Sequence, residues 1–146
     1  MQENDGFIRS SAIDSLKGLQ SWEERYKAII ALGKQMKPFP EEFKTDDLKV
    51  KGCQSQVWIK ADLTADGRVE FLADSDALIV KGLVALLLSV YSGQTPQQIL
   101  ANPPEFIKEL GFANYLSPNR ANGLYAMVKQ IQYYALAFEA LQKSKL

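Results

Sequence analysis

Apolar side chains recur every three or four positions along much of the chain, which is the spacing of helices with a buried face. Ser21 and Thr95 each begin a Ser/Thr-x-x-Glu/Gln pattern, and Ser117-Pro118 is a further sign of a helix start. Prolines and glycines punctuate the stretches between these segments. We therefore predict helices at about 10–19, 21–36, 77–92, 95–102, 104–110 and from 117 to near the end.

Between the second and third predicted helices the apolar period changes from about 3.6 to two. Apolar residues at alternate positions of 57–63 indicate a strand with one buried face, and Asp66-Gly67 followed by 68–73 indicates a hairpin and its return strand. A short extended piece at 48–50 precedes them. The prediction is an α+β domain with a small antiparallel sheet of about three strands and Cys53 in the loop between the first two.

Composition narrows the class of protein. A length of 146 residues suits a single domain over 1–146. Lys plus Arg and Asp plus Glu both number 17, and no basic run suggests nucleic-acid binding. The most apolar run, Ala77 to Tyr91, is interrupted by Lys81 and is shorter than the roughly 20 residues that span a bilayer. We expect no membrane partner.

The cysteine content and the N-terminus suggest a cytoplasmic location. One cysteine cannot form an internal disulfide, which favours a reducing compartment. The first six residues are polar and lack the basic and apolar regions of a signal peptide. The chain also has no histidine. This removes Cys-His and Ser-His-Asp catalysis, and with one cysteine it disfavours a metal site.

Cys53 is the main candidate for chemistry. Gly52 precedes it at an expected turn, and the polar residues Gln54, Ser55 and Gln56 follow, which favours a reactive loop thiol over an inert core residue. Without histidine, Lys51, an arginine from elsewhere or backbone donors would have to stabilise the thiolate.

Two charged residues are further candidates, each with a structural alternative. Arg120 is at the third position of the last predicted helix, where a cation opposes the helix dipole; it serves the site or is a solvated surface arginine. Asp76 precedes the central helix, where an acid commonly stabilises the N-terminus.

Several motifs together resemble the SufE family of sulfur-acceptor proteins. The most specific is Gly52-Cys53-Gln54-Ser55-Gln56-Val57-Trp58, and the matches run in the family's order over about Ser21 to Ile131, while residues 1–20 contribute little. The other matching pieces are Trp22-Glu23-Glu24-Arg25-Tyr26, Gly33-Lys34, Ser75-Asp76-Ala77, Lys81-Gly82-Leu83, Leu116-Ser117-Pro118-Asn119-Arg120, Gly123-Leu124 and Ala126-Met127.

The resemblance implies an α+β fold similar to IscU-type cluster scaffolds and a cysteine desulfurase partner, SufS-like or similar, which itself holds pyridoxal phosphate. Cys53 matches the acceptor cysteine, Arg120 the arginine of Ser-Pro-x-Arg, and Asp76 the acid before the central helix. The implied function is persulfide transfer onto Cys53, desulfurase activation and sulfur delivery to an iron–sulfur scaffold. A single cysteine is consistent with sulfur transfer but not with building a cluster.

This assignment makes the protein a sulfurtransferase-like accessory without a cofactor of its own; whether it forms a homodimer is left open. Two alternatives differ in the role of Cys53. In one, the protein is an adaptor that regulates a desulfurase without carrying sulfur. In the other, it is a self-sufficient thiol peroxidase or hydrolase, and the missing histidine argues against a hydrolase.

Overall fold

A two-stranded antiparallel sheet lies against a helical body in the computed structural model, which describes residues 8 and 10–144. Strand β1 (Val57–Leu63) pairs with β2 (Val69–Ser75), from Val57 opposite Ser75 to Leu63 opposite Val69. The helices are α1 (Ser11–Lys17), α2 (Trp22–Lys34), α3 (Leu78–Tyr91), α4 (Pro96–Ala101), α5 (Glu105–Glu109), α6 (Phe112–Tyr115) and α7 (Pro118–Ser144). The predicted α+β class is confirmed. Of the weakly assigned N-terminal segment 1–20, residues 1–7 and 9 lie outside the described residues, and α1 falls within the helix predicted at 10–19.

The prediction of about three strands is wrong by one. Two short 3-10 turns, Glu41–Phe43 and Asp46–Leu48, come before β1, and at 48–50 the chain forms only a single bridge, between Lys49 and Trp58, in place of a strand. Only one ladder bond, from the amide of Val50 to the carbonyl of Val57 at 2.8 Å, accompanies that bridge. The segment is too short to extend the pairing before the chain turns at Gly52, so the sheet keeps two strands in this part of the chain.

Helix α3 is the centre of the core, as its apolar sequence predicts, and it packs tightly against α2. The two helices approach through glycine: a Cβ on Gly82 would overlap the carbonyl oxygen of Ile29, and one on Gly33 would lie 2.9 Å from the amide nitrogen of Gly82. These contacts leave no room for a side chain between the backbones.

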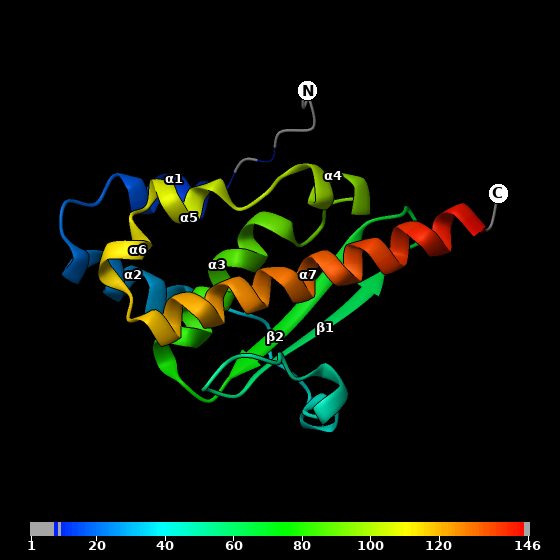
Figure 1. The fold of residues 1–146 in the computed structure, drawn as a ribbon, viewed down its shortest axis with the longest axis horizontal. Coiled ribbons are helices and arrows are strands. Elements are labelled where there is room, and N and C mark those ends of the chain that lie inside the picture. Colours follow the sequence, from blue (N-terminus) through cyan, green and yellow to red (C-terminus); the bar gives the residue numbers. More distant parts are fainter. Residues whose placement is uncertain (1–7, 9, 145–146) are drawn as a thin grey trace.

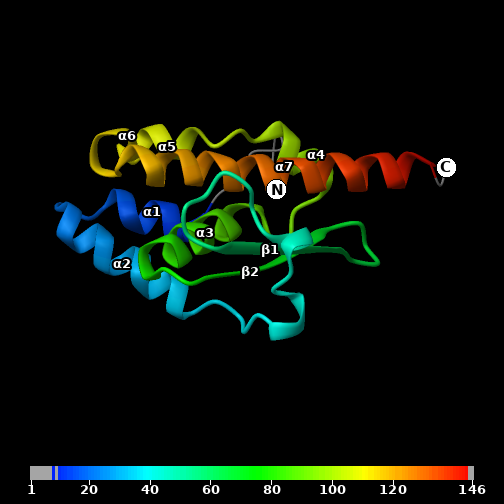
Figure 2. The same ribbon diagram turned by 60° about the horizontal axis from the view of Figure 1, so that its bottom comes forward.

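Helix α7 crosses the whole molecule and covers the sheet and α3 from the opposite side to α2 (Figures 1 and 2). Its buried stripe includes Leu124, Met127, Val128, Ile131 and Ala135. In Figure 2 the loop that precedes β1 rises toward the first half of α7. Segments that lie 70 residues apart in the sequence therefore meet beside the Cys53 loop.

The predicted capping boxes are both present. At Ser21 and at Thr95 the side chain accepts a hydrogen bond from the third helical amide, and the Glu24 or Gln98 side chain accepts one from the cap's own amide. None of the helices in the described part of the chain is long and apolar enough to cross a membrane.

Candidate functional site

The loop that carries Cys53 is closed at its base by backbone and carboxylate bonds. The amide of Gln56 donates to Oδ1 of Asp76 at 3.0 Å, and the amide of Asp76 donates to the carbonyl of Gln56 at 3.3 Å. Gly52 turns the chain with φ +94°, a left-handed conformation that glycine adopts without strain. Asp76 thus ties the loop to the start of α3; the helix cap is Ala77, which makes no side-chain bond.

The thiol of Cys53 packs against the first turns of α7. Its Sγ lies 3.4 Å from the carbonyl oxygen of Gly123, to which the thiol donates a weak hydrogen bond. A Cβ on Gly123 would lie 3.4 Å from the same sulfur, and one on Gly52 would lie 3.4 Å from the Cβ of Ala126. Both distances are ordinary van der Waals contacts, so the loop lies directly against the helix, and it is the positive φ of Gly52 that favours glycine there.

The surroundings of the sulfur favour a neutral thiol in this conformation. Cys53 is half-buried, and burial raises its pKa above the ordinary value because a thiolate loses hydration there. A carbonyl oxygen as hydrogen-bond acceptor also favours the protonated form. The thiolate stabilisation that a reactive cysteine needs is therefore not provided in this state.

Cys53 faces a pocket of about 360 Å³ between its loop and the start of α7. Val80 and Met127 form the apolar part of the wall. The polar part consists of Gln54, Ser55, Ser117, Asn119 and Arg120. A larger hollow of about 650 Å³ between the end of α2 and β2 contains no cysteine, so the smaller pocket is the candidate site.

Arg120 lies in the first turn of α7, and its guanidinium makes no hydrogen bond or ion pair with any residue that the structure describes. Its backbone amide donates to the Ser117 hydroxyl at 3.2 Å, which confirms the predicted helix start. The other two described arginines are engaged: Arg25 donates to the Leu110 carbonyl, and Arg68 binds the Gly93 carbonyl and Asp66.

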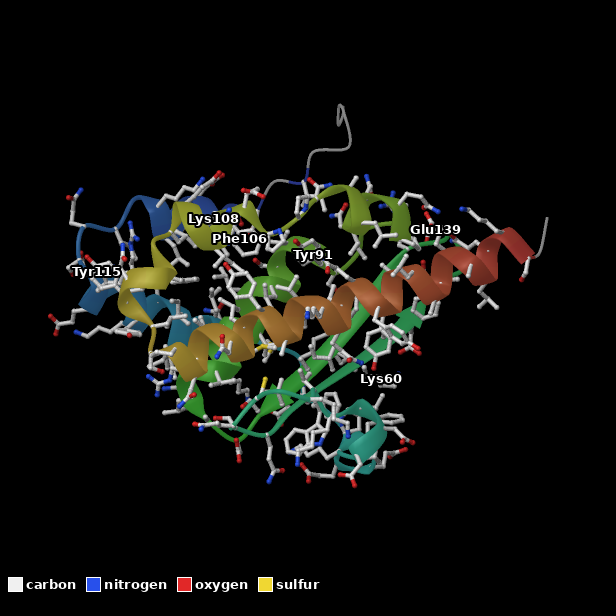
Figure 3. The ribbon with its side chains drawn as sticks, in the orientation of Figure 1. Lys60, Tyr91, Phe106, Lys108, Tyr115 and Glu139 are labelled. Carbon is white, nitrogen blue, oxygen red and sulfur yellow. The ribbon has the colours of Figure 1, made fainter. Side chains whose placement is uncertain are left out.

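An aromatic cluster on α2 holds the segment that leads into α7. Trp22 stacks on Tyr115 with ring centroids 4.3 Å apart and lies 5.4 Å from the ring of Phe112. The Tyr26 hydroxyl donates to the Tyr115 carbonyl at 3.0 Å. Figure 3 shows Tyr115 at the end of the molecule where α6 meets α2. These contacts hold α6, the segment just before the helix that carries Arg120.

The predicted site residues fall into three groups. Cys53, Gln54, Ser55 and Arg120 line one pocket. Lys51 and Gly52 line a separate hollow, together with Tyr125 and Lys129. Gln56 and Asp76 bond to each other below the loop. The structure therefore does not place Lys51 in the same pocket as the thiol.

Sequence reasoning missed Val80 and Met127, the apolar wall of the pocket. Both lie on helices with many buried positions, and nothing in the pattern distinguishes a side chain that lines a pocket from one in the core. The low helix propensity of glycine is a signal that could have pointed to a close approach at Gly123, but it could not have named Cys53 as the partner. Among the described residues, no group of three or more Cys, Asp or Glu side chains is placed to hold a metal ion.

Fold and site together define a class of α+β domain with one half-buried thiol on a loop between its helical layers. The SufE family profile, described as "Fe-S metabolism associated domain", matches residues 10–135. An uncharacterized SufE-like protein of Synechocystis sp. is 46% identical over 117 residues, covering 80% of this chain and 73% of that protein. The chain therefore belongs to the SufE family, which is associated with iron–sulfur metabolism.

A solved structure of similar fold comes from Thermus thermophilus. It is the solution structure of a hypothetical protein, with a TM-score of 0.74 and 24% sequence identity, covering 88% of this chain and 93% of that one. This likeness supports the α+β architecture.

Proposed function

We propose that this protein takes sulfur from a cysteine desulfurase onto Cys53, stimulates that enzyme and passes the sulfur on for iron–sulfur cluster assembly. The observation that carries the proposal is the position of Cys53: an unpaired thiol on a loop at the protein surface, beside a pocket with an unpartnered arginine. Membership of the SufE family supports the same assignment.

The transfer is a displacement at sulfur that needs no metal or cofactor on the acceptor. The Cys53 thiolate attacks the terminal sulfur of the desulfurase's cysteine persulfide. A new S–S bond forms on Cys53, the S–S bond on the enzyme breaks, and the enzyme's cysteine leaves as a thiolate. The terminal sulfur moves with its proton, and the proton that Cys53 loses on activation balances the one the leaving thiolate takes up.

The resting geometry requires a step before this attack. The thiol is half-buried and bonded to the Gly123 carbonyl, while its loop is tied to Asp76 by the Gln56 bonds. Docking on a desulfurase would have to release at least the first contact, so that the sulfur reaches the donor and gains thiolate character. Shelter at rest would also protect a bound persulfide from stray thiols.

The test is to incubate the reduced protein with a desulfurase and L-cysteine, and to measure its intact mass and map the modified peptide. We expect one added sulfur atom, located on Cys53, and faster cysteine turnover by the enzyme. Cys53→Ser should remain unmodified and lose the stimulation when reductant is present. A wild-type chain that stays unmodified while the desulfurase carries a persulfide would contradict sulfur transfer. Full stimulation of the desulfurase by Cys53→Ser would favour the adaptor alternative.

A further inference from the structure

We propose that the Cys53 pocket also binds a small persulfide bearing a carboxylate, of the type formed by free cysteine, and takes sulfur from it directly. This inference rests on the proposed function, because it uses Cys53 as the same sulfur acceptor. It adds a second class of donor, recognised by the pocket instead of by protein docking.

The charge at the pocket suits an anion. The Arg120 guanidinium is unpaired among the described residues, and no acidic side chain is among the residues that line the pocket. Lys44 and Lys81 are already paired, because both bind the Asp74 carboxylate, at 3.1 and 3.3 Å. Arg120 therefore provides an uncompensated positive charge on the same pocket as the thiol, and its planar guanidinium suits a carboxylate.

The size and the other lining groups suit a molecule of amino-acid size. A volume of about 360 Å³ is at the small end of the roughly 300–1,000 Å³ range of ligand pockets. The hydroxyls of Ser55 and Ser117 and the amide of Asn119 supply further donors and acceptors on the polar wall. Val80 and Met127 give the pocket an apolar surface against which a methylene and sulfur would pack.

Arg120 can bind the free carboxylate of a small donor, and a protein donor offers no such group beside its sulfur. A cysteine persulfide within a protein chain has no free carboxylate beside its sulfur, because that group is part of a peptide bond. Free cysteine persulfide has one, and a guanidinium bound to it would hold the terminal sulfur near the thiol. Binding in this orientation would raise the local concentration of the donor at Cys53.

The reaction balances without an oxidant or reductant. The Cys53 thiolate attacks the terminal sulfur of the protonated small persulfide, and a new S–S bond forms as the old one breaks. Free cysteine leaves as its thiolate and takes a proton from solvent, replacing the proton that Cys53 released. The net change converts the Cys53 thiol and cysteine persulfide into the Cys53 persulfide and cysteine.

The test compares two freshly prepared anaerobic donors, L-cysteine persulfide and the persulfide of L-cysteine methyl ester, which lacks the carboxylate charge. Sulfur addition to the full chain is followed by intact mass against donor concentration. We expect saturable charging, about three- to fivefold faster with the acid than with the ester, as for an exposed charge pair. Arg120→Gln should lose this preference and Arg120→Lys should retain part of it.

Lys129→Gln is the matched control, because Lys129 is an exposed cation on the same helix that lines the other hollow. It should keep the wild-type preference. Equal rates for acid and ester in the wild type, or an unchanged preference in Arg120→Gln, would overturn the inference.

A parallel experiment incubates each variant with a desulfurase and L-cysteine and measures the sulfur added to Cys53. Charging by the desulfurase without a preference for the acid donor would leave the proposed function standing and reject the small donor. Charging by the acid donor alone, with none from the desulfurase, would reject the proposed function and support the small donor.

Discussion

At the scale of single residues, the site contains a thiol whose immediate contacts favour its protonated form. Burial and the Gly123 carbonyl both act against the thiolate of Cys53. The cation in the pocket lining, Arg120, is exposed, where solvent screens its effect. A sheltered neutral thiol should react slowly with an electrophile that is neither bound in the pocket nor delivered by a partner protein.

This arrangement predicts slow, strongly pH-dependent alkylation of the folded protein. Because the folded pKa of Cys53 is raised, the thiolate fraction at neutral pH is lower than in the unfolded chain and grows as pH rises through the folded pKa. The rate with iodoacetamide, measured across the range from neutral to alkaline pH by mass spectrometry, should have its midpoint above that of the same protein in denaturant. A folded midpoint below the denatured one would mean that the thiolate is stabilised. By the same linkage, this group's contribution to stability is present below the unfolded pKa and is lost as pH rises through the folded pKa.

At the scale of elements, the loop and two helices form the site by short contacts at a few positions. The Cys53 thiol contacts the Gly123 carbonyl of α7, Gly52 forms the turn of the loop, and Asp76 directly before α3 holds the loop's end. Asp76 therefore binds the loop and makes no capping hydrogen bond to α3, while its place directly before the cap Ala77 still suits an acid that stabilises the helix N-terminus.

Asp76→Ala should loosen the loop while leaving the fold intact. It removes the acceptor for the Gln56 amide, a hydrogen bond at an exposed site, so the free energy of unfolding should fall by about 0.5–1.5 kcal/mol. Cys53 alkylation should become several-fold faster, because the loop opens more often. Denaturant unfolding measures the first effect and iodoacetamide labelling the second.

Asp76→Asn is the matched control, since an amide oxygen can still accept from Gln56. It should remain close to the wild type in both measurements. Unchanged labelling in Asp76→Ala would show that the contacts between Cys53 and α7 alone hold the loop.

Local sequence patterns predicted most of the helices and strands. The prediction failed at 48–50, where a strand depends on pairing with another segment. The capping boxes at Ser21 and Thr95 and the Asp66-Gly67 hairpin involve neighbours in sequence, so their side chains suffice to specify them. The supposed strand at 48–50 depended on pairing with β1 across the Cys53 loop. Its length and the turn at Gly52 limited that pairing to a single bridge.

At the scale of the whole molecule, one carboxylate links three parts of the chain beneath the site. Asp74 on β2 binds Lys44 in the segment before β1 and Lys81 on α3. Burial alone would raise the pKa of Asp74, but hydrogen bonds from Lys44, the Ser75 amide and Lys81 together outweigh it and lower the pKa. Lys44 also lies over the ring of Trp58, 5.3 Å from its centroid.

The protein should therefore lose part of its stability in acid through Asp74. A depressed folded pKa contributes stability above the unfolded value of about 4, and this contribution is lost as pH falls through the folded pKa. Asp74→Asn should lower the free energy of unfolding by roughly 1 kcal/mol at neutral pH, as for a partly exposed charge pair. The difference from the wild type should shrink below a pH of about 4.

Urea unfolding at neutral pH, and again in acid below the unfolded pKa of the carboxyl, measures the difference in free energy of unfolding between Asp74→Asn and the wild type at each pH. Asp62→Asn is a suitable control, because Asp62 pairs with one lysine, Lys60, on the exposed side of the hairpin. A difference in free energy of unfolding between Asp74→Asn and the wild type that stays constant with pH would contradict a stabilising role for the carboxylate's charge.

The sequence by itself determined the class of fold, the boundaries of most helices and the identity of the thiol. Periodicity, caps and turns are local properties, and a lone cysteine between glycine and polar residues is distinctive without any knowledge of contacts. The family motifs around Cys53, Asp76 and Arg120 were also readable there.

Only the tertiary structure decided the state of that thiol and the role of each partner. Packing against α7 partly buries Cys53, and this burial raises the pKa of its thiol, whereas the sequence left open whether the thiol is exposed or sheltered. Lys51 lines another hollow, Asp76 holds the loop, and Arg120 shares the pocket with the thiol. Solvation and electrostatics depend on distances between residues that are 70 positions apart in the chain, which the local pattern does not encode.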